Sequence, residues 1–460
     1  MEYTETNPDN SKLILVVVSL STFLAAFMGS SVNIALPAIG RELHMDAVSL
    51  GWVTTGFILA SVVSLVPFGR IADIHGRRKV LTWGVIVYTT ASFILSLAHT
   101  SFLLISMRLV QGVGSAMIFS TGVAIITSVF PRRERGKALG ISVAMTYMGL
   151  SLGPVIGGLL TENVGWRSIF WVTVPLGILI IILISWRLKA DWAEARGEKY
   201  DFVGTVTYGF VLVSVIYGFS RLPDIIGIGL IAAGIAGGVY FVQRGKNIKH
   251  PILNLDLFRK NRMFAFSNLA TLLNYSALFA ITFLLSLYLQ YIKGYNPQSA
   301  GLILVAMPAV QAVFSPIAGR LSDRIEPRIL ASIGMGVNAA GLLALMLLNE
   351  DTGTRTIVSI LVMMGFGYAF FTSPNSNAIM SSINQRSYGV ASATMATMRQ
   401  IGMSFSMGIT MMLFSMYIGR VEITPQYYGM LMHSTRIAFS VFAVLCAAGV
   451  YFSLARGNTR

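Results

Sequence analysis

The sequence predicts an all-α integral membrane protein with fourteen transmembrane helices in a six, two, six order. Of its 460 residues, 55% are hydrophobic and only 12% are charged, about half the charged content of a soluble domain. Apolar runs of about 20 residues, long enough to cross about 30 Å of hydrocarbon, recur along the chain. A motif that begins at Gly69 also recurs at Gly319. Composition, run length and this repeat together indicate the fold class.

Fourteen apolar runs use most of the chain, so no soluble domain is left over. The N-terminal segment is acidic and polar, unlike a cleaved signal, and we expect the first run to be retained as a crossing. The expected crossings are 12–37, 48–72, 79–98, 102–130, 136–161, 167–186, 202–219, 224–243, 262–292, 296–321, 328–348, 354–382, 387–418 and 433–455.

Lys and Arg are divided unevenly between the loops, and cytoplasmic loops of membrane proteins carry the excess. Alternate loops, together with the termini and Arg386, hold 25 of the 34 basic residues, whereas the other side holds six. This asymmetry predicts a multi-pass protein of the cell membrane with both termini in the cytoplasm. Because the net charge of +15 comes from these short clusters, we expect no nucleic-acid partner.

The repeated motif divides the chain. "GRIADIHGRRK" follows the second expected crossing and "GRLSDRIEPR" follows the tenth, so removing crossings seven and eight leaves six on each side. We predict an N-terminal domain over 1–201, two additional helices with a basic cytoplasmic linker over 202–261, and a C-terminal domain over 262–460. The two additional helices carry no catalytic constellation, and they could be spacers, a lipid seal or a partner surface.

The first copy of the motif contains groups that could hold two helices together. Asp73 and Arg77 are four residues apart and can pair in a helical turn, while Gly69 and Gly76 allow a tight reversal. A surface ion pair contributes only about 0–1 kcal/mol, so a simple loop is one interpretation. The echo, with Asp323 at the corresponding place, favours a latch between helices that part.

The fifth expected crossing contains a stripe of small residues. Gly149, Gly153 and Gly157 recur every four residues and allow another helix to approach closely. Pro154 removes a backbone hydrogen bond and bends the helix, and Gly158 follows on the next turn. Static packing and a hinge or sealing face for a moving helix are both compatible with this pattern.

Three arginines, Arg108, Arg399 and Arg436, lie inside expected crossings, where a charged side chain needs a polar environment. A guanidinium in lipid costs several kcal/mol, so Arg108, followed on one face by Gln111, is expected to face a polar interior. For Arg399 in the other half, a structural bond to backbone carbonyls is an equal alternative. Further polar residues within the crossings are candidate cavity residues, although each is more often an interhelical hydrogen bond. They are Tyr147, Asn274, Gln311, Asn375 and Asn377.

Several classes of protein are disfavoured. One cysteine, Cys446, and five histidines at the edges of crossings supply no metal or cofactor site. The chain has no G-x-x-x-x-G-K-[ST] sequence, which argues against a nucleotide-driven pump. No cluster of acid and base groups lies at membrane depth, so we do not expect an enzyme. A sensor or scaffold without transport needs no site and stays an alternative.

The ordered segments "GRIADIHGRRK", "RLVQGVGSA", "GLSLGPVIGG" and "WRSIFWVTVPLG" resemble the signatures of the major facilitator superfamily. "PILNLDLFRKNRMFA", "YLQYIKGYNPQSAGL" and "GVASATMATMRQIG" further resemble its fourteen-helix drug:proton antiporter branch. The resemblance covers about residues 25 to 455. It implies two six-helix bundles that rock about a central cavity, and multidrug efflux in exchange for protons.

The stretch "AAFMGSSVNIALPAI" departs from that pattern. The resemblance implies an Asp five residues before Asn33, and Met28 stands there, leaving Asn33, Ser31 and Ser30 as uncharged polar groups toward a cavity. All 19 acidic residues fall in loops or at the ends of crossings. Proton exchange would then need an edge acid, either Asp73 or Glu162.

The position of the acidic residues, away from the middle of the expected crossings, indicates which partners to expect. We expect a cavity that accepts neutral, amphipathic or anionic solutes better than permanent cations. The expected partners are the lipid bilayer, amphipathic small molecules and protons, and the expected state is a monomer. A carrier for one neutral or anionic solute, without an intramembrane carboxylate, is the alternative reading.

Overall fold

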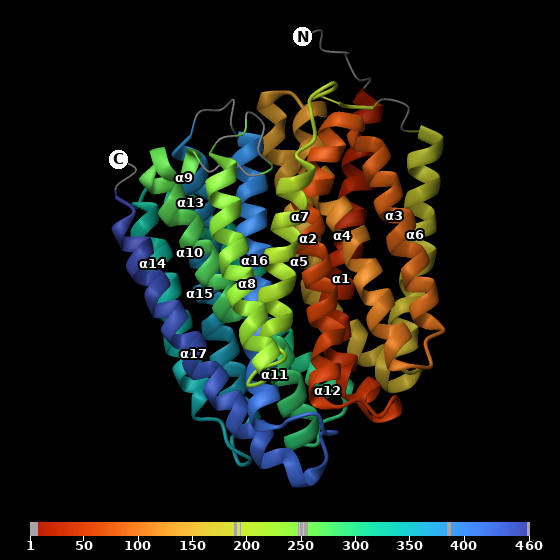
Figure 1. Ribbon diagram of the computed structural model, residues 1–460, viewed down its shortest axis with the longest axis vertical. Coiled ribbons are helices and arrows are strands. Elements are labelled where there is room, and N and C mark those ends of the chain that lie inside the picture. Colours follow the sequence, from red (N-terminus) through yellow and green to blue (C-terminus); the bar gives the residue numbers. More distant parts are fainter. Residues whose placement is uncertain are drawn as a thin grey trace.

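The computed structural model describes residues 8–187, 191–193, 195–246, 248, 252, 256–383 and 388–457. Within these ranges the chain is helical, and its only extended pairing is an isolated bridge between Asp46 and Glu422. Figure 1 shows the helices running side by side along the long axis of the molecule, with the two ends of the chain at the same end. Arg386, counted above among the basic loops, lies outside the described residues.

The first eight expected crossings are each formed by one helix. They are α1 (Pro8–Glu42), α2 (Ala47–His75), α3 (Arg77–Ser96), α4 (Ser101–Val129), α5 (Arg132–Asn163), α6 (Arg167–Arg187), α7 (Phe202–Phe219) and α8 (Ile225–Gly245).

The remaining six expected crossings include two that are broken. A short α9 (Asp256–Lys260) precedes α10 (Arg262–Leu278), α11 (Ala280–Leu287) and a π turn, η1 (Tyr288–Ile292), which together form the ninth. The tenth consists of α12 (Pro297–Leu304) and α13 (Ala306–Ser322). The others are α14 (Pro327–Met346), α15 (Thr354–Ser381), α16 (Tyr388–Tyr417) and α17 (Tyr428–Ala455), which a 3₁₀ turn, η3 (Pro425–Tyr427), introduces.

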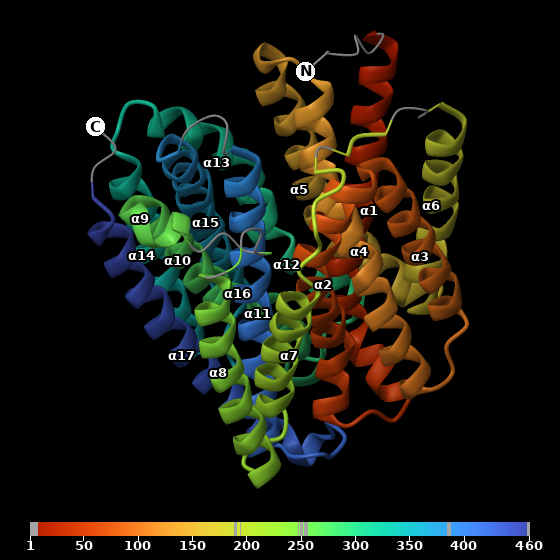
Figure 2. The same cartoon turned by 45° about the horizontal axis from the view of Figure 1, so that its top comes forward.

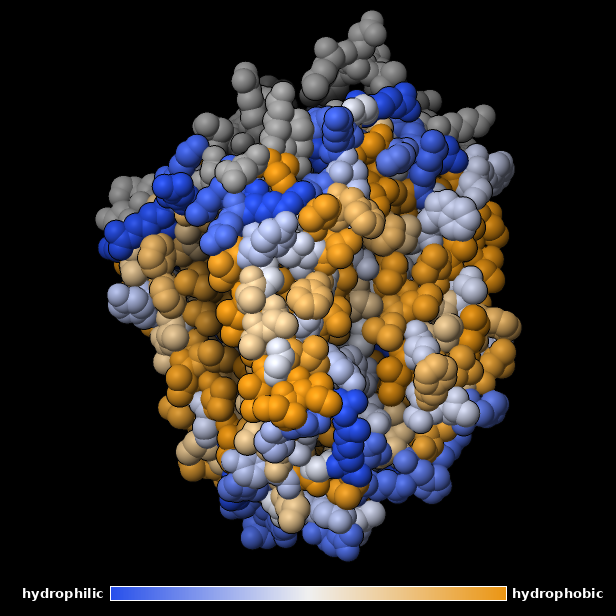
Figure 3. Space-filling view, viewed as in Figure 1, coloured by the Kyte–Doolittle hydropathy of each residue, from blue (hydrophilic) through white to orange (hydrophobic). Residues whose placement is uncertain are grey.

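Every expected crossing therefore lies on a helix, and α17 begins five residues before the expected start because the 3₁₀ turn leads into it. Thirteen helical segments of the described chain are long and apolar enough to span a membrane, and α16 is a further helix of 30 residues. Figure 3 shows a broad hydrophobic band around the middle of the molecule, between hydrophilic ends. This distribution is the one that a bilayer requires.

Three aspartates cap the starts of α2, α7 and α8. The Asp46 side chain accepts hydrogen bonds from the backbone N–H groups of Val48 and Ser49 at the start of α2. Asp201 caps α7 in the same way through Gly204. A carboxylate satisfies the free N–H groups of the first turn and complements the helix dipole there. Among the described residues, each Asp and Glu lies in a loop or within one turn of a helix end.

The helices form two groups. Figure 2 shows α1, α3, α5 and α6 on one side and α10, α14, α15 and α17 on the other, with α2, α16, α11 and α12 between them. The α7 and α8 pair lies over the seam between the groups in both views. The Tyr208 hydroxyl of α7 donates to the carbonyl of Val62 on α2, and Ser415 of α16 donates to the carbonyl of Leu222 in the α7–α8 turn. The pair is therefore bonded to both groups.

Candidate functional site

Two faces of α5 determine how the halves meet. On one face, Gly149 lets the helix touch α1, since a β-carbon there would lie 2.7 Å from the Phe23 carbonyl oxygen. Gly153 and Gly157 continue this contact with α1 along the same stripe. On the other face, a β-carbon at Gly158 would lie 2.5 Å from the Pro297 carbonyl oxygen of α12. The glycine stripe thus packs within the N-terminal half, whereas Gly158 and its neighbour Pro154 seal against the C-terminal half.

The π turn adds a second seal between α1 and the C-terminal half. The side-chain amide of Gln290 donates to the carbonyl of Ile34 (2.9 Å), and Ser286 donates to the carbonyl of Asn33 (2.7 Å). Gln290 lies within the π turn, and Ser286 lies on α11 just before it. Both contacts lie toward the end of the molecule opposite the chain termini. The halves are thus held together at that end.

The polar stretch of α1 is used for helix packing. Ser30 and Ser31 donate to the carbonyls of Gly149 and Gly153 on α5, at 3.3 and 3.0 Å. The side-chain oxygen of Asn33 accepts from the Thr54 hydroxyl of α2 at 3.0 Å. Met28, which stands where the resemblance to the fourteen-helix branch implies an Asp, is fully buried. These hydroxyl and amide groups join α1 to its neighbours within the N-terminal half.

Five polar side chains from five helices lie near one another at the interface between the halves. The Tyr147 hydroxyl of α5 lies beside the side-chain amide of Gln311 on α13. Its electrostatic neighbours are Tyr275 of α10 and Arg399 of α16. Tyr368 of α15 packs edge-on against Tyr275, with ring centroids 5.6 Å apart at 89°. We call Tyr147, Tyr275, Gln311, Tyr368 and Arg399 the central cluster.

Close helix packing brings this cluster together. Three residues after Arg399, a β-carbon at Gly402 would lie 2.5 Å from the Leu272 carbonyl oxygen and 2.9 Å from the β-carbon of Tyr275. Glycine at this position lets α16 touch α10 beside Tyr275, three residues along the helix from Arg399. The neighbouring Gln400 donates to the Ser61 hydroxyl of α2 at 3.2 Å. Residues 399 and 400 of α16 therefore lie between the two halves.

Arg399 is half-buried, and no hydrogen bond or ion pair joins its guanidinium to the residues that the structure describes. The side-chain nitrogen of Gln311, which is 5% exposed, likewise has no partner there. The Ser151 hydroxyl, one turn from Tyr147 on the same face of α5, is a further unpartnered polar group. Such groups mark a place for water or a solute.

Arg108 has a different environment. It is 1% exposed, donates to the Val53 carbonyl at 2.9 Å and to the Gln111 side chain at 2.5 Å, and lies over the Phe57 ring at 4.2 Å. Gln111 in turn donates to the Ser92 hydroxyl at 2.8 Å. This network links α2, α3 and α4 inside the N-terminal half. The structure does not bring Arg108 or Gln111 to the central cluster.

The other three predicted asparagines differ in their hydrogen-bond partners. Asn375 accepts from Arg456 at 2.6 Å and donates to the Ser267 carbonyl at 3.1 Å. Asn377 donates to the Ser322 hydroxyl at 2.9 Å, beside Asp323. Asn274 is fully buried, and neither atom of its side-chain amide has a hydrogen-bond partner in the described structure. Of the predicted cavity residues, the structure brings Tyr147 and Gln311 together at the central cluster and pairs Arg108 with Gln111 inside the N-terminal half.

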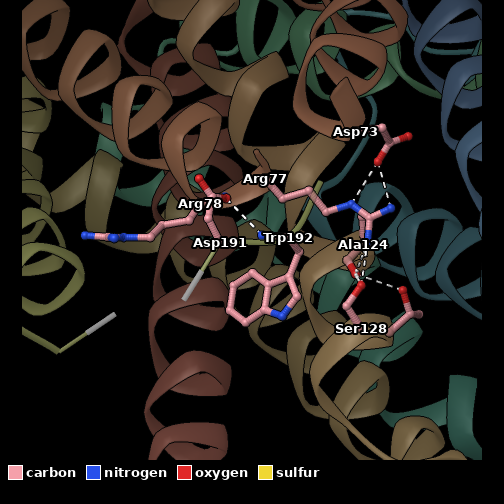
Figure 4. A network of polar contacts seen from close by, with 8 residues as sticks. Asp73, Arg77, Arg78, Ala124, Ser128, Asp191 and Trp192 are labelled. Carbon is pink, nitrogen blue, oxygen red and sulfur yellow. Dashed lines mark hydrogen bonds and ion pairs between the residues drawn. The ribbon is translucent and has the colours of Figure 1, made fainter. Parts of the chain in front are cut away.

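The first copy of the repeated motif forms a network at the end that carries the termini (Figure 4). Arg77 donates to the Asp73 carboxylate at 2.8 Å and to the Ser128 hydroxyl of α4 at 2.5 Å. Gly76 has φ of +119°, and a β-carbon there would collide with the Asp191 carboxylate, which accepts from the backbone N–H of Arg78 at 3.0 Å. The α2–α3 turn is thus clasped to α4 and to the segment after α6.

The other predicted gating and proton-carrying residues lie at helix ends or in packed faces. A β-carbon added at Gly69 would lie 3.6 Å from the β-carbon of Ser120 on α4, an ordinary contact distance. Glu162 is exposed, one residue before the end of α5 and fifteen residues from Tyr147. In the described part of the chain, no group of three or more His, Cys, Asp and Glu could hold a metal ion.

Sequence reasoning named Tyr147 and Gln311 but missed Tyr275 and Tyr368. Both tyrosines lie inside long apolar runs, where aromatic residues usually face lipid or core. The one available signal was their position near the middle of a crossing, away from the interfacial belt where tyrosine is common.

The sequence pattern of the Major Facilitator Superfamily matches residues 18–407 and, in a second match, 269–458. This chain belongs to the Major Facilitator Superfamily. Its relatives in the superfamily are transporters, so the chain is a membrane transporter and not an enzyme. The two matches begin in different halves of the chain.

Relatives in the superfamily differ in what they carry. The chain is 29% identical over 399 residues to the riboflavin transporter RibZ of Clostridioides difficile, covering 86% of each chain. It is 29% identical over 407 residues to the multidrug resistance protein Stp of Mycobacterium tuberculosis, covering 86% of this chain and 74% of Stp. A bacterial homologue of the human lysosomal transporter Spinster, solved inward-facing and unoccupied, shares the superfamily fold. Its TM-score is 0.72 at 15% identity over 98% of both chains.

Proposed function

We propose that this superfamily member is a secondary active exporter of amphipathic small molecules that works by alternating access and is driven by proton entry. The observation that carries the proposal is the arrangement along the interface between the halves. One end is sealed through α5 and α12 and through α1 and the π turn. Directly inside that seal, polar groups from both halves meet in the central cluster.

The spacing along α5 supports this arrangement. Tyr147 lies seven residues before Pro154, about 10 Å along the helix axis at 1.5 Å per residue. A solute held at the central cluster would therefore lie near the membrane centre, with the seal between it and one compartment. Rocking of the halves would break the Gly158 contact with Pro297 and open the end that is sealed here. Tyr147 and Gln311 are the predicted cavity residues to which we assign substrate contact.

The same proposal includes the number of crossings, the orientation of the chain and the boundaries of the two halves. We propose fourteen crossings, with α16 as the crossing beyond the thirteen apolar segments, and both termini in the cytoplasm of a monomer in the cell membrane. The halves are 1–201 and 262–460, and α7 and α8 within 202–261 cover the seam between them. The latch residues Asp73, Arg77 and Asp323 then lie at the cytoplasmic end.

Proton coupling is assigned to an acid at the edge of the membrane. Asp73 or Glu162 would carry the proton, because every described carboxylate lies at a helix end or in a loop. Protonation of such a group would couple to transport by controlling the opening and closing of one end of the protein. The proton would not compete directly with the solute at the membrane centre.

Uptake into inverted vesicles tests the function. Riboflavin, fluorescein and ethidium serve as neutral, anionic and cationic probes, with vesicles that lack the protein as the blank. We expect saturable uptake that falls when nigericin collapses an inside-acid pH gradient, and that falls with Asp73→Asn or Glu162→Gln. Uptake that does not depend on the pH gradient would refute proton coupling but would still support transport. Absence of saturable uptake for all three probes would contradict the exporter.

A further inference from the structure

We propose that the central cluster binds the anionic group of a planar aromatic solute, with Arg399 as its counter-charge. The inference rests on the proposed transport function and names the class of solute that the same site takes. It follows from the charge, the unpartnered donors and the aromatic rings that the five side chains present.

Charge is the first argument. A guanidinium at membrane depth costs several kcal/mol unless it is paired or hydrated. Arg399 has no carboxylate partner, since each described Asp and Glu lies in a loop or within a turn of a helix end. Its planar fork of N–H groups is the geometric complement of a carboxylate, which it binds through two parallel hydrogen bonds. An anionic solute would supply the negative charge that the described residues do not place beside Arg399.

The second argument is a comparison with Arg108, the same residue type in the N-terminal half. Arg108 is 1% exposed, and its donors go to the Val53 carbonyl and to Gln111, with the Phe57 ring against its face. The protein can therefore satisfy a buried guanidinium from its own groups when the guanidinium is structural. Arg399 is half-buried, and its guanidinium donates no such hydrogen bond to the described residues.

The unpartnered amide of Gln311 supplies a further donor. Its nitrogen is buried without a hydrogen-bond partner in the described structure, although Gln311 lies beside Tyr147. Buried polar groups are rarely left unpaired in the working state of a protein. Together with the hydroxyls of Tyr147, Tyr275 and Tyr368, this amide offers hydrogen bonds to the acceptors of a second polar group on the solute.

The rings determine the shape of the solute. Tyr275 and Tyr368 form an edge-on pair, and Tyr147 approaches them from the opposite half. Aromatic rings associate in edge-to-face or offset stacks, so a flat aromatic body matches these walls better than a flexible chain does. Contacts from both halves would also make the solute sensitive to rocking.

A set of three probes with one ring system tests the inference by titration calorimetry on the purified full-length protein in detergent. The probes are naphthalene-2-carboxylate, naphthalene-2-carboxamide and (2-naphthylmethyl)trimethylammonium. A charge-assisted pair predicts that the carboxylate binds about tenfold to a hundredfold more tightly than the amide. Equal binding of carboxylate and amide, or tighter binding of the ammonium, would overturn the proposal.

Three variants locate the effect. Arg399→Gln should remove the preference for carboxylate while the amide binds as before, and Arg399→Lys should keep part of the preference. Arg420→Gln removes one positive charge from an exposed loop residue and should change neither the preference for carboxylate nor the affinity for the amide. A preference that survives Arg399→Gln would place the anion elsewhere.

The outcomes separate the two proposals. Selective binding of the carboxylate without vesicle uptake of any probe would refute the exporter and leave the anion site. Saturable uptake without carboxylate selectivity would refute the anion site and leave the exporter. If Arg399→Gln does not fold, the wild-type probe series and Arg399→Lys still decide the matter.

Discussion

The backbone carbonyl of Pro154 on α5 lies directly against Gly301 on α12, with no room for a β-carbon at Gly301. One turn along α5, Gly158 approaches Pro297 of α12 in the same way. Backbone contacts of this closeness need glycine on one side, because any other residue would push the helices apart. The seal between the halves therefore depends on a few glycine positions that join segments distant in sequence.

Replacing Gly158 by alanine should loosen this seal. We expect Ser151→Cys, placed just inside it in a Cys446→Ser background, to react several times faster with an impermeant maleimide applied at the sealed end. Gly229→Ala on α8 is the control, since nothing lies within 4 Å of a β-carbon there. Equal labelling rates in the two alanine variants would show that Gly158 does not maintain the seal.

Arg108→Gln and Arg399→Gln should differ in stability. Loss of Arg108 leaves the Val53 carbonyl and Gln111 without their partner in a buried network, at about 1–3 kcal/mol for each unsatisfied group. Arg399 makes no such bonds to the described residues, so its replacement should change the unfolding temperature little. Thermal unfolding in one detergent compares the two, and a larger loss for Arg399→Gln would contradict the assignment of roles.

Asn375→Leu should destabilise the C-terminal half through Arg456. Burial lowers the pKa of Arg456 to about 10, so the 2% exposed side chain stays charged at neutral pH. Without Asn375, the Ser267 hydroxyl would be the remaining hydrogen-bond partner of Arg456 among the described residues, and losing a buried hydrogen bond to a charged group costs about 1.5–3 kcal/mol.

A double variant tests that coupling. Arg456→Met in the Asn375→Leu background removes the uncompensated charge and should restore most of the lost stability. The free energies of unfolding for the two single variants and the double variant give the interaction energy. Additive losses would mean that Asn375 does not act through Arg456.

Asp73→Asn should weaken the clasp at the α2–α3 turn. Arg77 is 6% exposed and would keep Ser128 as a partner but lose its ionic acceptor, for a loss of about 1–3 kcal/mol. Limited proteolysis of the segment around Asp191 and thermal unfolding would measure the change. Glu134→Gln, an exposed residue in the first turn of α5, is the control and should have no effect.

Much of the architecture could be predicted from the sequence because the bilayer imposes a one-dimensional rule. A segment that crosses hydrocarbon must be long, apolar and helical, so the runs around 202–219 and 262–292 were located to within a few residues. The repeated loop motif and the position of the acidic residues between the apolar runs can likewise be read directly from the sequence.

The candidate site could be predicted only in part. Tyr147 and Gln311 stand out as polar residues in apolar runs, but so do Asn375 and Asn377, which the structure uses in local networks. Nothing in the local sequence separates these two uses. The π turn that aims Gln290 at α1 is also invisible in the hydrophobic pattern.

The sequence by itself determined that this protein is a helical membrane protein of two related halves, with its acids kept at the membrane edges. Only the tertiary structure decided which buried polar groups are satisfied and which are open, as the pair Arg108 and Arg399 illustrates. The physical reason is that the partners of a side chain inside a bundle come from other helices. Which of them it meets depends on the rotation and spacing of helices packed at glycine contacts far away in the chain.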